Sequence, residues 1–170
     1  MPNLWAPWRI EYVTHPGREG CFLCTALAQA KAPAALVLAL RERVFVVLNK
    51  YPYTAGHLMV VPNRHVAGLD DLAPEELADL LLVGREMCAL LGRVMRPHGF
   101  NLGLNLGRPA GAGLEEHLHL HVVPRWSGDT NFMPVLDGVT VVPEALAATA
   151  AKLREALEAP PSPGAAPGGA

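Results

Sequence analysis

Two segments of the chain alternate strictly between apolar and polar positions. In FNLGLNLG, residues 100–107, phenylalanine or leucine fills every second position, and asparagine or glycine fills the others. In HLHLHVV, residues 117–123, leucine and valine alternate with three histidines. Successive side chains of a strand point to opposite faces, so both segments are predicted strands and the histidines share one face. If the two strands pair as a hairpin across GRPAGAGLEE, Asn105 also lies on the histidine face.

The remaining hydrophobic pattern predicts two more strands and two or three helices. The segments at 43–49 and 57–62 are short, rich in β-branched residues and separated by turn-forming sequence. Residues 74–95 carry apolar side chains every three or four positions, which predicts a helix that ends before an Arg-Pro pair. Residues 143–158 have leucines at near-helical spacing, and a third, shorter helix is expected after Cys24. Together these elements predict an α+β domain with a mainly antiparallel sheet.

The length and charge of the chain indicate a single globular domain and argue against a nucleic-acid-binding protein. With 170 residues, 18% of them charged, it is long enough to bury the core of one globular domain. We expect that domain to span residues 1–158, followed by a flexible tail at 159–170 that holds little besides Pro, Gly and Ala. The formal net charge of −2 provides no basic surface field, which argues against nucleic-acid binding.

No segment predicts a membrane span or a secretion signal. The longest apolar run, at 32–40, is interrupted by Pro33 and is too short to cross a bilayer. The N-terminus lacks a basic stretch followed by an apolar one, so a cytoplasmic location is expected. Three cysteines, an odd number, argue against a disulfide scaffold and leave the pair Cys21 and Cys24 for zinc, redox chemistry or neither.

The row of histidines allows three interpretations. They could form a solvated face, although the opposite face of the strand is purely apolar. They could bind zinc, because His-x-His on a strand can chelate the metal when a further ligand comes from elsewhere. One of them could instead be a covalent nucleophile. A neutral imidazole attacks phosphorus when an acceptor holds one ring nitrogen as N–H and leaves the lone pair of the other free.

Beyond these patterns, residues 4–136 resemble the histidine-triad superfamily, in particular its bacterial branch near the diadenosine tetraphosphate phosphorylases. The family motif His-φ-His-φ-His-φ-φ, in which φ is apolar, is matched at every position of 117–123. The blocks LWAPWR, NKYPYTAGHLMVVPNRHV, RPHGFNLGLNLG and HLHLHVVPRWSGDTNF match in the same order. The resemblance implies a five-stranded, mainly antiparallel sheet with two or three helices.

The resemblance also implies an activity and a role for each histidine. Family members cleave nucleotides at the α-phosphate through a nucleotidyl-histidine intermediate, so the expected substrates are dinucleoside polyphosphates and the acceptor is water or phosphate. His119 would be the nucleophile, His121 would contact the phosphates or the leaving group, and the His117 carbonyl would accept the His119 N–H. Two alternatives stay open: a nucleotide-binding regulatory module with little catalysis, and a hydrolase of nucleoside phosphoramidates.

By the same resemblance, further residues are expected to bind the nucleotide. Asn49 would hold the ribose hydroxyls, and Phe22 and Val47 would form an apolar slot for the base. Ordinary core packing would also explain Val47. Asn105 and the backbone N–H groups between Gly107 and Gly113 would contact phosphate, because glycine permits close approach.

The chain departs from the family pattern just before the first histidine. Many members carry Gln and Ser or Thr there, as donors to the leaving group, whereas this chain has Leu114, Glu115 and Glu116. Carboxylates that pointed inward would repel a polyphosphate, so both are expected to face solvent. The choice between water and phosphate as acceptor therefore stays open.

A structural zinc site is also implied. Two thiolates and two imidazoles make a closed tetrahedral set, and no catalytic metal is required. The zinc ligands of family members with this Cys-x-x-Cys pair correspond here to Cys21, Cys24, His65 and His117. His57 is expected to pack in its turn and Cys88 to pack in the core.

Family members commonly form homodimers by joining their sheets. Trp5, Trp8 and Trp126 are candidate interface or lid residues, although burial in the core would explain them equally well. The expected partners are therefore a nucleotide substrate and a second copy of the chain.

Overall fold

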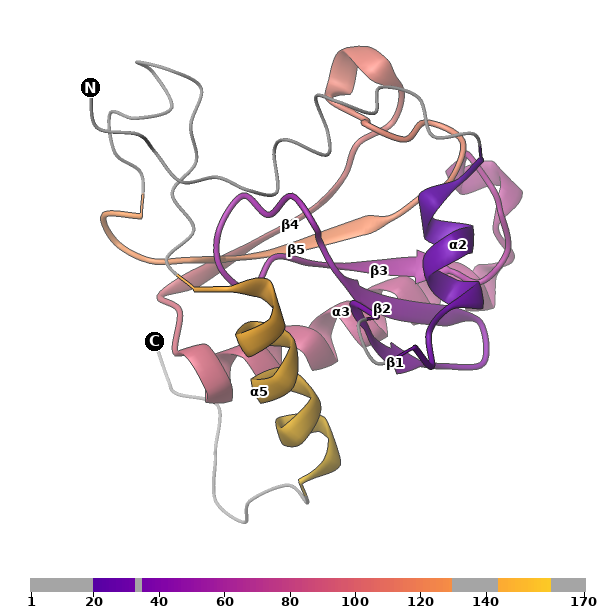
Figure 1. Cartoon of the computed structure of the whole chain (residues 1–170). Helices are drawn as coiled ribbons and strands as arrows, with labels where there is room; N and C mark the ends of the chain where they lie inside the picture. Colours follow the sequence, from indigo (N-terminus) through magenta and orange to yellow (C-terminus); the bar gives the residue numbers. More distant parts are fainter. Residues whose placement is uncertain (1–19, 33–34, 130–143, 160–170) are drawn as a thin grey trace, which may run out of the picture.

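The computed structural model describes residues 20–32, 35–129 and 144–159, and these ranges contain one five-stranded sheet (Figure 1). Its strands are β1 (Val37–Leu40), β2 (Val44–Leu48), β3 (Leu58–Pro62), β4 (Gly99–Leu104) and β5 (Leu120–Arg125). All neighbouring strands are antiparallel, in the order β1-β2-β3-β5-β4. The helices of these ranges are α2 (Phe22–Ala28), α3 (Pro74–Met95) and α5 (Leu146–Glu158), with short 3₁₀ turns η1 (Leu69–Asp71) and η2 (Arg108–Ala110). The predicted α+β fold is confirmed.

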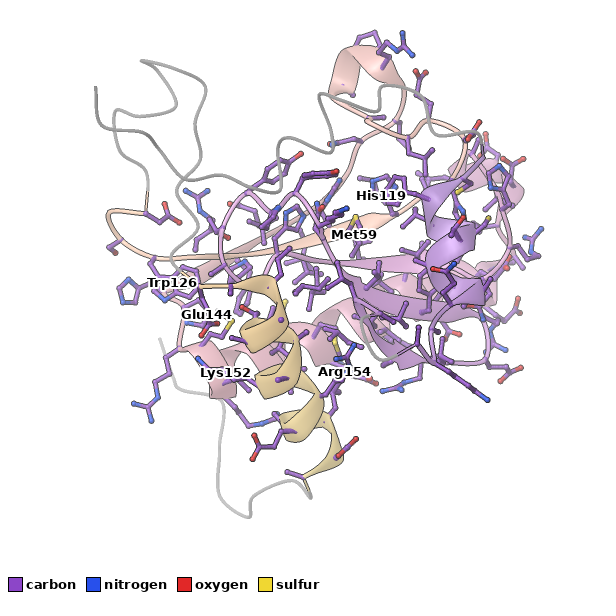
Figure 2. All side chains as sticks on the ribbon, viewed as in Figure 1. Met59, His119, Trp126, Glu144, Lys152 and Arg154 are labelled. Atoms are coloured by element: carbon purple, nitrogen blue, oxygen red, sulfur yellow. The ribbon has the colours of Figure 1, made fainter. Side chains whose placement is uncertain are left out.

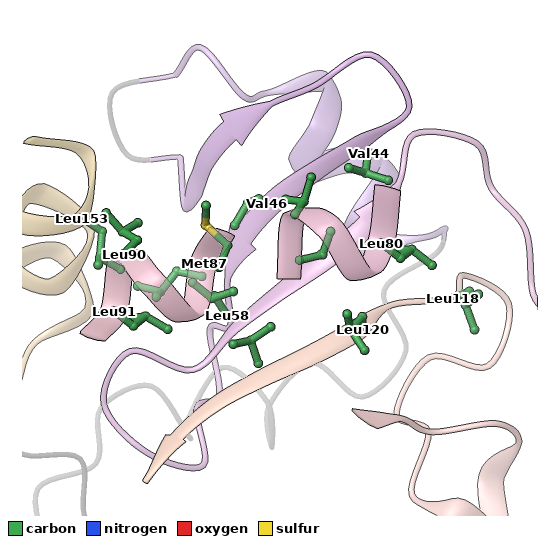
Figure 3. Close-up of a cluster of buried hydrophobic side chains, with 14 of the residues drawn as sticks. Val44, Val46, Leu58, Leu80, Met87, Leu90, Leu91, Leu118, Leu120 and Leu153 are labelled. Carbon is green, nitrogen blue, oxygen red and sulfur yellow. The ribbon is translucent and has the colours of Figure 1, made fainter. Parts of the chain in front are cut away.

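One face of the sheet is covered by α3 and α5 (Figure 1). Val46, Val60 and Leu120 belong to one buried cluster with Met87 and Leu90 of α3, and Figure 3 shows how the helix lies along the strands. Because alternate strand residues point to this side, the leucines between the triad histidines belong to the main core. The helices themselves are not membrane spans: none in the described ranges is long and apolar enough.

The opposite face of the sheet carries α2 and the histidines. Strand register places Val47 opposite Val37 and Met59, and Met59 opposite His121, so these side chains form one row across the sheet. Leu23 of α2 is fully buried in a second cluster with Val47 and Met59. The row therefore runs from apolar packing under α2 to the triad, which places apolar side chains next to the histidines.

The long helix α3 has clear start and stop signals. Pro74 occupies its first turn, and the Glu76 carboxylate accepts the Ala73 N–H at 2.8 Å. At the other end, Arg96 adopts the left-handed conformation with φ 50° before the proline. These local signals explain why the predicted range of 74–95 agrees with the observed helix.

The C-terminal helix α5 is hydrogen-bonded to the edge of the sheet. The Arg154 guanidinium donates to the carbonyls of Ala35 and Val37, at 3.1 Å for Val37, where β1 begins (Figure 2). Ahead of the helix, Glu144 accepts the Thr149 hydroxyl at 2.8 Å and pairs with Lys152. The helix thus covers the start of strand β1.

Several boundaries differ from the expectations. Strand β1 was not predicted, because its sequence VLAL has the composition of a helix and forms a strand only through pairing with β2. The short helix begins at Phe22 rather than after Cys24, because the Cys21 sulfur accepts the Cys24 N–H at 3.5 Å as its N-cap. Trp5, Trp8 and the tail beyond residue 159 lie outside the described residues.

The two alternating segments are shorter as strands than predicted. Strand β4 ends at Leu104, so Asn105 lies in the following loop. Strand β5 begins at Leu120, so His117 and His119 lie in the segment that leads into the strand. Leu102 of β4 is 45% exposed because β4 is the last strand of the described sheet, and its apolar row is only partly covered.

Candidate active site

The three triad histidines are nearly buried on the α2 side of the sheet. His117, His119 and His121 are 0%, 7% and 8% exposed. The Leu118 N–H donates to the Val66 carbonyl at 2.7 Å, which fixes the segment before β5. Figure 2 shows His119 beside α2, on the same side of the sheet as Met59. The predicted common face is therefore observed, even though only His121 lies within the strand.

The ring of His119 is held in one tautomer. Its Nδ1 lies 2.8 Å from the His117 carbonyl, which is an acceptor only, so Nδ1 carries the proton and donates. Burial lowers the pKa of His119, although the same hydrogen bond raises it. The imidazole is therefore neutral at pH 7, and the lone pair of Nε2 is available to an electrophile.

His121 is oriented by a chain of hydrogen bonds that begins at the backbone. The Tyr53 N–H donates to His57 Nδ1 at 3.1 Å, so the proton of the neutral His57 ring lies on Nε2. His57 Nε2 lies 2.9 Å from His121 Nδ1 and must donate to it. The proton of the neutral His121 ring is consequently on Nε2, which becomes a donor.

Asn49 adds to the same series of hydrogen bonds through His57. Its Oδ1 accepts the Tyr51 N–H at 2.9 Å, which leaves Nδ2 facing His57 Nδ1 at 3.4 Å as a weaker second donor. Asn49 thus fixes the loop that carries His57. Its predicted contact with the ribose stays a prediction.

The fully buried His57 should make stability depend on pH. Burial, followed by the nearby His121 and His119, lowers the pKa of His57 to about 3. Below pH ~6.5 the unfolded chain takes up a proton that the folded protein excludes, so stability is lost as the pH falls. Between pH 7 and pH 5 we expect a loss of about 2 kcal/mol from this residue.

Urea denaturation at pH 7, 6 and 5 measures this loss, with His57→Gln as the comparison. Both proteins contain the same Cys and His cluster, so a contribution from a bound metal cancels in the difference. Parallel losses of unfolding free energy in the two proteins would show that His57 does not bind its proton differently on folding.

Three further side chains form a compact cluster with His117 that has the geometry of a metal site. The ligand atoms of Cys21, Cys24, His65 and His117 all lie within 4.8 Å of one another. His117 Nδ1 is 3.2 Å from the Cys21 sulfur and 3.5 Å from the Cys24 sulfur, and His65 Nδ1 is 3.4 Å from the Cys24 sulfur. A tetrahedral zinc with ordinary bond lengths separates sulfur and nitrogen ligands by about 3.6 Å. The donor set and its spacing therefore fit zinc.

The surrounding contacts orient the ligands. His117 Nε2 lies 3.0 Å from the Pro62 carbonyl and donates to it, so the lone pair of Nδ1 faces the two sulfurs. Burial lowers the pKa of His117, which keeps the ring in the neutral form that binds metal. Beside His65, Arg64 binds the Glu76 carboxylate at 2.6 and 2.8 Å and ties the loop to the start of α3.

The predicted base slot corresponds to a pocket between α2 and the sheet. The pocket has a volume of about 310 Å³, which is small for a ligand site, and both Phe22 and Val47 line it. Met59 lines it too and pairs with His121 in the sheet, so this wall of the pocket is next to the triad. Phe22 is 46% exposed, which leaves its ring available to a ligand.

The loop after β4 brings Asn105 to the triad but uses several of its own N–H groups. Asn105 Nδ2 lies 3.5 Å from His121 Nε2, a contact too long to set the tautomer. The N–H groups of residues 110, 111 and 112 donate to carbonyls of Gly107 and Arg108. The loop therefore presents fewer N–H donors to phosphate than its glycine content suggests, and contacts of Gly107 and Gly113 with phosphate stay predictions.

The carboxylates before the triad are exposed. Glu115 binds Arg108 at 3.0 Å, and Glu116 faces solvent. Their orientation agrees with the expectation that they avoid the phosphates. Of the candidate aromatic residues, Trp126 is half-buried in the turn after β5, where its backbone N–H donates to the Asp129 carboxylate.

The sequence patterns missed His57 as part of the site. His57 lies in a turn, outside the alternating segments, and meets His121 only because β3 and β5 are neighbours. Tyr53, which stacks on His57 with ring centroids 4.6 Å apart, was missed for the same reason. The available sequence signal for His57 was a histidine directly before the apolar segment LMVVP.

Known proteins share both sequence and fold with this chain. Residues 29–128 match the HIT domain family. An AP-4-A phosphorylase from Mycobacterium tuberculosis is 42% identical over 154 residues, which cover 86% of this chain and 79% of that protein. An asymmetrical bis(5'-nucleosyl)-tetraphosphatase from Schizosaccharomyces pombe is 35% identical over 82 residues, which cover 48% of this chain and 44% of that protein.

Among solved structures, a zinc-bound histidine triad family protein from Mycobacterium smegmatis superposes with a TM-score of 0.65 and 30% identity. The alignment covers 83% of this chain and 95% of that one. A hypothetical histidine triad nucleotide-binding protein from Sulfolobus tokodaii gives a TM-score of 0.66 at 25% identity, over 81% and 92% of the two chains. With the domain match across the whole sheet and the 42% identity over most of both sequences, the chain belongs to the HIT (histidine triad) family.

Proposed function

We propose that the protein cleaves dinucleoside polyphosphates, such as diadenosine tetraphosphate, at the α-phosphate through a nucleotidyl-histidine intermediate. The observation that carries this proposal is the state of His119, whose Nδ1–H is held by the His117 carbonyl at 2.8 Å while Nε2 keeps its lone pair. The names of two relatives, AP-4-A phosphorylase and bis(5'-nucleosyl)-tetraphosphatase, support the same substrate class.

In the first step, His119 Nε2 attacks the α-phosphorus and a nitrogen–phosphorus bond forms. The bond from phosphorus to the bridging oxygen breaks, and the leaving polyphosphate keeps the electron pair on that oxygen. The Nε2–H of His121, fixed by His57, donates to a phosphate oxygen and stabilises the developing charge. Positioning of this kind accounts for most catalysis of phosphoryl-type transfer.

In the second step, an oxygen of water or inorganic phosphate attacks the same phosphorus. The nitrogen–phosphorus bond breaks, its electron pair returns to His119 Nε2, and the acceptor loses a proton. With diadenosine tetraphosphate, water yields AMP plus ATP, and phosphate yields ADP plus ATP.

Product analysis tests the proposal. The protein is incubated with diadenosine tetraphosphate, with and without inorganic phosphate, and the products are separated by chromatography. ADP plus ATP formed only with phosphate identifies a phosphorylase, and AMP plus ATP identifies an asymmetric hydrolase. Nucleotide binding without products would support the regulatory module instead. Cleavage of an adenosine phosphoramidate without cleavage of the tetraphosphate would support the third candidate.

We further propose that Cys21, Cys24, His65 and His117 hold a structural zinc, which would lock the His117 backbone. The support is the Cys₂His₂ donor set within 4.8 Å and the zinc-bound relative from Mycobacterium smegmatis. His119 takes no part in this cluster, and its Nδ1 is already committed to a carbonyl. The proposed zinc is therefore structural and does not bind the nucleophile.

A homodimer is proposed through β4. This strand ends the described sheet, and its residue Leu102 is 45% exposed. On helix α3, Leu81 is 64% exposed as well. An edge strand with apolar neighbours is a natural pairing surface for a second copy. Sedimentation of the wild-type chain as a monomer at micromolar concentration would overturn this assembly.

A single domain over residues 1–158, a tail at 159–170 and a cytoplasmic location are proposed as well. The last described helix ends at Glu158, which suits the domain boundary. All three cysteines are free, as reducing compartments require. Limited proteolysis that removes only the tail tests the domain and the tail, and fractionation with cytoplasmic markers tests the location.

A further inference from the structure

The pocket beside the triad has a polar end that the proposed reaction does not use. Helix α2 and its C-cap present Phe22, Thr25, Ala26 and Gln29 to the pocket, at the spacing of one helix face. Phe22 follows Cys21, whose sulfur contacts the His117 ring at 3.2 Å, so this end is nearest the triad. At 1.5 Å per residue, Gln29 lies roughly 10 Å further along the helix. A nucleotide with its phosphate at the triad would extend its base toward Thr25 and Gln29.

As it is bonded in this structure, the Thr25 hydroxyl presents a hydrogen-bond acceptor to a ligand. Its proton is donated to the Cys21 carbonyl at 3.2 Å, so the oxygen presents lone pairs to the pocket. A ligand atom with a proton is favoured at this position. A carbonyl oxygen there would face the lone pairs and lose its hydrogen bond with water.

Gln29 supplies both a donor and an acceptor. Its side chain is exposed at the pocket and has no hydrogen-bond partner among the described residues. A carboxamide pairs in a bidentate manner with adenine, because its oxygen accepts from the 6-amino group and its N–H₂ donates to the adjacent ring nitrogen. The other polar residue of the lining, Lys50, lies near the Tyr51 ring, with Nζ 5.8 Å from the ring centroid.

We infer that Thr25 and Gln29 read the base and make the pocket selective for adenine over guanine. The inference rests on the proposed function, because it assigns the pocket to the nucleoside whose phosphate is attacked. Phe22 and Val47 hold the faces of the base, which all bases share, whereas Thr25 and Gln29 meet its edge, which differs between bases. Adenine carries a 6-amino donor where guanine carries an oxygen.

Substitutions at the two positions test the selectivity. The value of kcat/KM is measured for diadenosine and diguanosine tetraphosphate, and the wild type should prefer adenine by at least about tenfold. Gln29→Leu and Thr25→Val should each lower this ratio about fivefold, chiefly through KM. Thr25→Ser keeps the hydroxyl and Lys31→Leu lies outside the pocket lining, so both should keep the wild-type ratio.

Binding of AMP and GMP to a His119→Asn protein, measured by calorimetry, separates this inference from the proposed function. Turnover of both substrates at equal rates, or a ratio unchanged in Gln29→Leu and Thr25→Val, would overturn the base assignment and leave the reaction standing. A preference for AMP that depends on Gln29, without turnover by the wild type, would overturn the reaction and support the assignment. Turnover together with a Gln29-dependent preference supports both.

Discussion

Replacement of His119 with asparagine should abolish turnover of diadenosine tetraphosphate, with a loss of kcat of at least about 10⁴-fold. The carboxamide can still donate to the His117 carbonyl, which now receives the imidazole Nδ1–H at 2.8 Å. It has no basic nitrogen lone pair to attack phosphorus, so the covalent intermediate cannot form. Steady-state kinetics measures the loss, and mass spectrometry of quenched reactions should detect a nucleotidyl adduct in the wild type only.

The matched control is His98→Asn, the same substitution at an exposed histidine that binds Ser127 at 3.1 Å. That variant should keep wild-type turnover. The His119 variant should also bind AMP within a few-fold of the wild type, because the base slot is intact. Substantial turnover by His119→Asn would contradict covalent catalysis by this residue.

Replacement of Cys21 with serine should remove zinc and weaken both the fold and the reaction. Cys21 is buried, contacts His117 and caps α2, so its loss affects the ligand set and the wall of the pocket together. The loss of unfolding free energy should be several kcal/mol, less than the ~10–16 kcal/mol that zinc-finger peptides gain, because the core already exists. Turnover should fall about 10- to 100-fold, since the His117 carbonyl that fixes His119 is less well held.

Metal analysis and urea denaturation of the same protein batches provide readouts independent of activity. Cys88→Ser is the matched control, since Cys88 is half-buried on α3 and takes no part in the cluster. It should retain one zinc per chain and most of the stability. Full zinc content in Cys21→Ser would rule out the proposed ligand set.

The sequence predicted the elements whose ends are set by neighbouring residues, such as helix caps and prolines. The helix at 74–95 has a proline in its first turn, a capping carboxylate and a terminal Arg-Pro pair, and the structure reproduces its limits. The alternation in HLHLHVV correctly separated the leucines, which join the core, from the histidines, which face α2. Strand β1 could not be predicted in this way, because only its pairing with β2 makes its sequence a strand.

The sequence predicted the parts of the candidate site whose cysteines and histidines match a family motif. The Cys-x-x-Cys pair and the histidines were assigned by resemblance, and the structure brings Cys21, Cys24, His65 and His117 together from three segments. The link from Tyr53 through His57 to His121 was not predictable, because it depends on tautomers that only the contact distances define. The hydrogen bonds within the loop at 107–112 could not be predicted from the sequence either. They reduce the number of backbone N–H groups that the loop can offer to phosphate.

The hydrogen bonds from Arg154 to the Ala35 and Val37 carbonyls affect whether further strands can add to the β1 edge of the sheet. A sheet with two exposed edges can add strands at both and grow into a fibre. Here α5 and Arg154 occupy backbone acceptors at the β1 end, whereas β4 ends the described sheet on the other side. The proposed pairing of β4 with its symmetry copy would consume that edge in both chains and leave a capped edge at each outer side. Such an assembly is closed at two copies, so the arginine would limit growth without touching the interface.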